Sequence, residues 1–84
     1  MSKGEWHLDL DAERDVLIPW LDAEPDAETR EAVVAWLGEM VKDPLRFQPD
    51  QHDVYWHRVK RTSVAVIWVL DRDGKAVVLV HIGD

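Results

Sequence analysis

The stretch VAVIWVLDRDGKAVVLVHI, residues 64–82, decides the fold of this chain. Two apolar runs, Val64–Leu70 and Ala76–Ile82, flank the charged segment Asp71–Lys75. Both runs are apolar at odd and at even positions, which predicts strands that are covered on both faces in the middle of a sheet. The Asp73-Gly74 pair between them is a strong signal for a hairpin turn. We therefore predict an antiparallel hairpin at the centre of the fold.

The residues before this hairpin predict a third strand and a helix. Val54–Arg61 mixes Val, Tyr and Trp with charged residues, which is typical of a strand with one exposed face. The segment Asp26–Lys42 is predicted to be an amphipathic helix, because its apolar residues recur at helical spacing: Val33, Val34, Leu37, Met40 and Val41. Asp43-Pro44 should end that helix, and Leu45–Asp53 is predicted to be a loop.

The N-terminal part predicts a short strand followed by an interrupted helix. In Trp6–Leu10, apolar residues alternate with polar ones, as in a half-buried strand. Asp9 or Asp11 can cap a helix whose apolar stripe is Val16, Leu17, Trp20 and Leu21. Pro19 lies inside this stripe, and it lacks a backbone donor. We therefore expect the helix to be short, kinked or broken near Leu17–Ile18.

These elements follow one another in the order β-α-α-β-β-β within one domain, residues 1–84. We predict an α+β fold in which the two helices pack on one face of an antiparallel sheet. The first strand should join the same sheet, because an isolated strand carrying Trp6 would be unstable. The five tryptophans are expected to serve mainly as core residues, with Trp56 as the exception.

Composition excludes several classes of function. The 84 residues include no cysteine, which removes disulfides, thiolate zinc sites and a cysteine nucleophile. The four histidines show no metal-ligand spacing, so we expect neither a metal nor a cofactor. The net charge of −7 argues against unspecific nucleic-acid binding. No apolar run approaches the ~20 residues of a membrane span, so we expect a cytoplasmic protein.

The charge is distributed unevenly along the chain. Residues 1–53 carry 14 acidic and five basic residues, whereas residues 54–84 carry three acidic and five basic residues. The acidic half is the one predicted to be helical. The predicted sheet half is slightly positive, which leaves room for a small cationic patch on an acidic protein.

The C-terminal half resembles the RelE/ParE superfamily of small bacterial toxins. Residues 58–83 are similar to that family's basic strand, central strand, acidic-glycine turn and final strand ending in an Ile-Gly step. A helix that ends in Met40-Val-Lys-Asp-Pro44 is also similar to the family. The resemblance implies the order of elements given above, a cognate antitoxin as partner, and a target that is either messenger RNA at the ribosome or DNA gyrase.

For members that cleave messenger RNA, the resemblance implies attack by the RNA 2′-hydroxyl on the adjacent phosphate. That reaction needs an acid, a base and cations. Arg58 and Lys60 match the cations of the basic strand, and their spacing predicts that both side chains lie on one face. His81 is the candidate acid or base, paired with His57 or Tyr55. The chain departs from the family at Ala65, where an arginine is usual, and at Gly83-Asp84, where it stops before the acid/base groups that usually follow the family's final Gly step.

Each candidate also has a structural interpretation. Arg58 and Lys60 can be a solvated face that prevents edge-to-edge pairing, and His81 can be an ordinary sheet residue. Trp56 lies on the predicted face of Arg58 and Lys60, which indicates a cation–π cluster or a binding patch. This patch includes two further residues, Arg61 and His57.

Two functions follow from these alternatives. The first is the toxin-like component of a toxin–antitoxin pair, an endoribonuclease if it is an enzyme at all. The second is a non-catalytic interaction module with the same fold, such as a degenerate toxin or a homodimer built through a sheet edge. Because fold does not determine activity, the predicted fold does not decide between these two functions.

Overall fold

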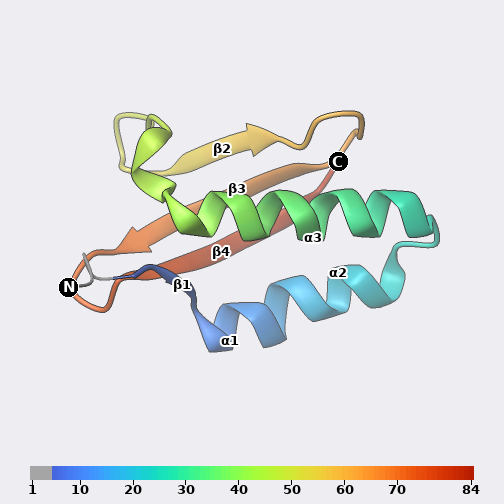
Figure 1. Ribbon diagram of the computed structural model, residues 1–84, viewed down its shortest axis with the longest axis horizontal. Coiled ribbons are helices and arrows are strands. Elements are labelled where there is room, and N and C mark those ends of the chain that lie inside the picture. Colours follow the sequence, from blue (N-terminus) through green and yellow to red (C-terminus); the bar gives the residue numbers. More distant parts are fainter. Residues whose placement is uncertain (1–4) are drawn as a thin grey trace.

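Residues 5–84 form a four-stranded sheet with helices on one of its faces in the computed structural model (Figure 1). This arrangement confirms the predicted α+β class; residues 1–4 of the predicted domain lie outside the described residues. The elements in chain order are β1 (His7–Leu8), α1 (Leu10–Ala12), η1 (Glu13–Leu17), α2 (Ile18–Ala23), α3 (Ala27–Lys42), η2 (Pro44–Arg46), β2 (Tyr55–Arg58), β3 (Ala65–Asp71) and β4 (Ala76–Gly83).

The strand order is β1-β4-β3-β2. The two strands with apolar residues on both faces, β3 and β4, therefore occupy the centre of the sheet, as predicted. The prediction of a purely antiparallel sheet is wrong, because β1 pairs in parallel with β4 through His7–Ala76 and Leu8–Val77. The chain reverses direction an even number of times between these strands, which makes them parallel (Figure 1). β1 is also shorter than predicted, since the Asp9 carboxylate already accepts from the Ala12 N–H at 3.0 Å and caps the helix.

The first helix continues through Pro19 instead of breaking. The segment η1 is a π-helical turn that ends at Leu17, and the Ile18 N–H donates to the Glu13 carbonyl, five residues back. Pro19 follows directly after this wider turn, and Leu17 and Ile18 before it keep helical backbone angles. The irregularity therefore falls where the sequence predicts it, and the wider turn accommodates the proline without interrupting the helix.

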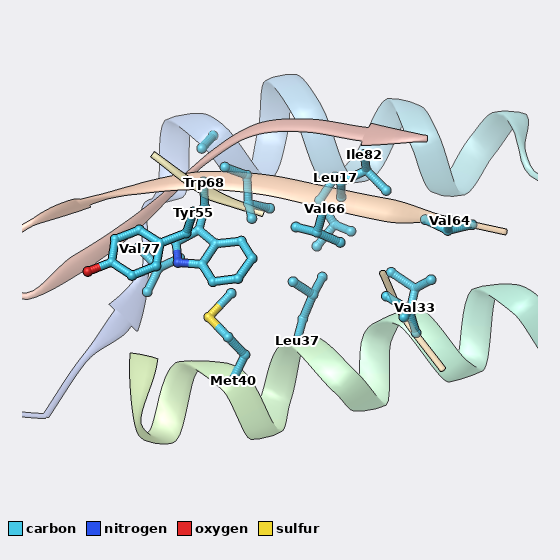
Figure 2. Close-up of a cluster of buried hydrophobic side chains, with 13 residues drawn as sticks. Leu17, Val33, Leu37, Met40, Tyr55, Val64, Val66, Trp68, Val77 and Ile82 are labelled. Atoms are coloured by element: carbon cyan, nitrogen blue, oxygen red, sulfur yellow. The ribbon is translucent and has the colours of Figure 1, made fainter. Parts of the chain in front are cut away.

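Helix α3 matches its prediction within one residue. Asp26 is the N-cap and accepts hydrogen bonds from the Thr29 hydroxyl at 2.5 Å and the Thr29 N–H at 3.2 Å. These bonds lower the pKa of the Asp26 carboxyl, with the Thr29 hydroxyl as the main cause. Val33, Leu37 and Met40 are the buried residues of the helix, and they face the sheet (Figure 2).

The core lies between α3 and the central strands. Val66 and Trp68 of β3 are fully buried, and they lie opposite Leu37 and Met40 (Figure 2). The Trp68 ring stacks on Tyr55 at 5.5 Å between centroids. The remaining described tryptophans with a predicted core role, Trp6, Trp20 and Trp36, are partly buried against this core, which confirms their predicted packing role.

Shortening Leu37 tests this packing. We expect Leu37→Ala to lower the free energy of unfolding by about 2–5 kcal/mol, because it removes buried methyl groups and leaves a cavity under β3. Val34→Ala is a matched control on the same helix, since Val34 is 48% exposed, and it should change stability by less than about 0.5 kcal/mol. Denaturant unfolding of both variants measures the difference. Equal effects would contradict the assignment of Leu37 to the core.

Candidate functional site

The sheet face that points away from the helices carries three of the six candidate residues: Trp56, Arg58 and His81. Trp56 of β2 is paired with Ile67 of β3, which is paired with His81 of β4. Strand side chains alternate between faces, and the neighbours of these residues face the helices. We call the surface formed by Trp56, Arg58, Ile67, Val80 and His81 the open sheet face. Trp56 is 57% exposed and Val80 is 54% exposed.

A β-bulge shapes the open sheet face at its β4 side. Ile67 opposes His81 while the next residue, Trp68, opposes Leu79, so Val80 is the additional residue on β4. Val80 and His81 are consequently both exposed, although they are adjacent in sequence. A Cβ atom at position 83 would lie 3.1 Å from the His81 Nε2, so Gly83 leaves space for that imidazole. Bulges of this kind reorient side chains and are common beside functional sites.

Arg58 brings a positive charge to the same surface. It pairs with Ala65 of β3, and Ala65 pairs with Gly83 of β4. The two residues across the sheet from Arg58 are therefore both small. The row of Trp56, Ile67 and His81 lies next to the row of Arg58. His81 lies on the second strand from β2 and in the neighbouring row, so it is diagonal to Arg58 across the sheet.

Lys60 does not share this surface, and the predicted common face of Arg58 and Lys60 is wrong. Strand β2 ends at Arg58, and Lys60 lies in the following turn. There it lines a hollow of about 540 Å³ together with residues on the helix side of the sheet: Ala35, Trp36, Glu39, Arg46, Phe47 and His57. The alternation that places residues 58 and 60 together holds only within a strand, and the strand stops too early.

His57 and Tyr55 also face the helices, so neither forms the predicted acid/base pair with His81. The His57 imidazole stacks on Trp36 at 5.3 Å between centroids and meets the Phe47 ring edge-on at 5.2 Å. Its Nδ1 is buried and has no hydrogen-bond partner. Tyr55 is 3% exposed and stacks on Trp68. The predicted patch of Trp56, Arg61 and His57 is therefore divided between two faces.

Arg61 belongs to the turn after β2, where its φ of 66° lies in the left-handed region. The Val59 N–H donates to the Val64 carbonyl at 2.9 Å across this turn. Arg61 is exposed and lies beyond the strand that carries Trp56 and Arg58. The positive charge of Arg61 therefore lies beyond the end of β2, outside the open sheet face.

Sequence reasoning missed the residues that line the hollow from the loop side. Phe47 lies in the segment predicted to be an aperiodic loop, yet its ring contacts Trp36, His57 and Trp68. The Arg46 guanidinium lies 4.8 Å from the centre of the Phe47 ring. A single phenylalanine in a polar loop has no periodic signal. Its burial depends on where the loop returns to the sheet.

Two further observations concern the described residues 5–84. Within this range, no group of three or more His, Cys, Asp or Glu side chains is placed to hold a metal ion. Within the same range, no helix has the length and apolar character needed to cross a membrane.

Comparison of the chain with protein-family models, curated proteins and solved structures finds no match. The resemblance to the RelE/ParE superfamily thus remains a prediction from the residues quoted above.

The loop that leads into β2 offers a test by pH. The Asp50 carboxylate accepts from the Val54 N–H at 3.0 Å and the His52 N–H at 2.7 Å, and these bonds lower the pKa of Asp50, chiefly through Val54. A lowered folded-state pKa stabilises the fold above the unfolded value of about 3.9, and this stabilisation is lost as the pH falls through the folded pKa.

We therefore expect Asp50→Asn to have a lower Tm than the original chain at pH 6. The difference should shrink as the pH falls below about 4 and the carboxylate becomes protonated. Thermal unfolding followed by circular dichroism at several pH values measures this. A difference in Tm that stays constant with pH would contradict a role for the carboxylate charge.

Proposed function

We propose that this chain is the toxin-like component of a toxin–antitoxin pair, with a RelE/ParE-like fold, a cognate antitoxin as partner, and messenger RNA translation or DNA gyrase as target. The observation that carries the proposal is the open sheet face. Arg58, Trp56 and His81 lie in two adjacent rows of this surface, opposite the helices. The order of elements and the helices on one face also support the proposal.

The open sheet face supplies part of what RNA cleavage needs. In the implied reaction, a 2′-hydroxyl loses a proton, its oxygen attacks the adjacent phosphate, and the leaving 5′-oxygen gains a proton. Arg58 would stabilise the negative charge that develops on the phosphate. His81 would accept or donate one of the two protons, since imidazole can do both near neutral pH. Trp56 would offer an exposed ring on which a base can stack.

A second candidate function is a non-catalytic interaction module, and a specific observation favours it. Lys60 lines the hollow on the helix side, and Ala65 lies beside Arg58 on the sheet. The open sheet face thus carries fewer cations in its paired rows than the resemblance implies. Removing a group that stabilises transition-state charge costs about 10²–10³ in rate. A module that only binds a partner protein does not need cations to stabilise a transition state.

Induced expression in a bacterial host tests the proposal. We expect the chain alone to arrest growth, and co-expression of a small protein encoded beside its gene to relieve the arrest. Arg58→Ala should relieve it as well, because Arg58 is the charged residue of the open sheet face. Arg72→Ala is the matched control: it removes the same charge from the β3–β4 turn, at the opposite end of β3, and should leave the arrest intact.

Normal growth during confirmed expression of the folded chain would overturn the toxin proposal and leave the interaction module. Where growth does stop, purified chain can be assayed for cleavage of messenger RNA on ribosomes and for inhibition of DNA supercoiling by gyrase. Loss of cleavage in both Arg58→Ala and His81→Ala would support the nuclease branch. Gyrase inhibition without cleavage would support the other branch.

A further inference from the structure

Helix α3 contains a glycine that the packing of the fold does not require. Gly38 lies in the interior of the 16-residue helix, where glycine is among the least favourable residues. Among residues 5–84, a Cβ atom built at this position would meet no atom within 4 Å apart from the neighbouring backbone of the helix itself. Neither close packing within the protein nor an unusual backbone conformation therefore requires glycine here. Its missing side chain instead leaves open space on the outside of α3.

That space belongs to an apolar groove between the first helical segment and α3. A hollow of about 280 Å³ at Gly38 is otherwise lined by aliphatic side chains: Leu8, Leu17, Val34, Leu37 and Val41. A second hollow, of about 570 Å³, shares Val34 and continues toward the other end of α3, where it is lined by Leu21, Asp22, Arg30, Glu31 and Ala35. We call the two together the helix groove. From Arg30 to Val41 it follows α3 for about 17 Å.

The groove is open to solvent, and small residues form part of its surface. Val34, which lines both hollows, is 48% exposed. Ala35 and Gly38 lie three residues apart on α3 and therefore share one side of the helix. Small residues allow another backbone to approach closely. A helix laid between two antiparallel helices would bury an apolar stripe in such a groove, at positions i, i+3, i+4 and i+7.

The charge of the helix surface indicates which kind of partner the groove can bind. Between positions 9 and 43 the chain carries eleven acidic and three basic residues. Asp22 and Glu31 line the groove itself. Arg30 lines it too, and its guanidinium donates to the Glu24 carbonyl, so the lining carries two acidic residues and one basic residue. The helices of a second copy would bring the same acidic surface and would be repelled, whereas basic residues beside an apolar stripe would complement the rim.

We propose that the helix groove binds a basic amphipathic helix of a partner protein, with Gly38 as the point of closest backbone approach. The length of the groove accommodates about three turns of such a helix. This surface is on the opposite side of the sheet from Arg58 and His81. The proposal does not depend on toxin activity, and its test therefore has no growth readout.

The test uses the full chain, labelled with ¹⁵N, and a synthetic 18-residue peptide of Leu, Lys and Ala with leucine at i, i+3, i+4 and i+7. A peptide of identical composition with the leucines dispersed around the helix is the control. We expect the first peptide to shift the amide signals of Val34, Gly38 and Val41 and to leave those of Ile67 and Val80 in place. Equal binding of both peptides, or shifts confined to the open sheet face, would overturn the proposal.

Paired variants locate the contact. Val34→Ala and Val80→Ala are the same chemical change at two exposed valines on opposite faces of the molecule. We expect the first to weaken peptide binding at least threefold and the second to leave the Kd unchanged. The reverse pattern would place the peptide on the open sheet face and overturn the proposal. Glu31→Lys should also weaken binding, because it reverses a charge of the rim.

Gly38→Ala separates binding from folding. We expect it to raise the Tm by about 2–8 °C, since alanine is the better helix former and has room. It should nevertheless weaken peptide binding severalfold, and Gly38→Leu should weaken it more. A Gly38→Ala variant with a higher Tm and an unchanged Kd would show that the glycine serves no partner and would overturn the inference of close approach.

Discussion

The contacts of Trp68 with the rings around it hold the sheet to α3, and the rest of the structure depends on them. Trp68 is fully buried and lies within 5.4–5.6 Å, between ring centroids, of Tyr55, Trp36 and Phe47. These rings come from β2, α3 and the loop after η2. One indole thereby fixes the helix, an edge strand and a loop against the central strand. In a domain of this size, which buries a limited share of its surface, such a cluster is a large part of the available core.

The packing of these rings also carries a cost in stability. The indole Nε1 of Trp68 and the imidazole Nδ1 of His57 are both buried without a hydrogen-bond partner. Leaving a polar group in this state is unfavourable by about 1–3 kcal/mol. The aromatic packing that surrounds the two rings offsets the loss. The same packing directs His57 away from the open sheet face, which carries His81 and the exposed Trp56.

One-sided coverage of the sheet separates two surfaces of different chemistry. The helices carry most of the negative charge on their outer side, together with the apolar groove around Gly38. The opposite face of the sheet carries Arg58, Trp56 and His81. The separation follows from the chain order, because 14 of the 17 acidic residues precede position 54 and the strands of the basic half follow it. A small acidic protein can in this way present a limited cationic surface, and a partner on one face need not cover the other.

The sequence by itself determined the class of fold, the helix from position 26 to 42, the central hairpin and the location of the irregularity before Pro19. These features depend on local periodicity, caps and turn residues, which act over a few positions. The parallel pairing of β1, the early end of β2 and the inward position of His57 were decided by the tertiary structure. They depend on how many times the chain reverses and on which rings reach Trp68, and neither is encoded in the spacing of neighbouring residues. The candidate site was therefore predictable at Arg58, Trp56 and His81, whereas Lys60, Phe47 and the groove at Gly38 were defined by contacts between segments that are distant in sequence.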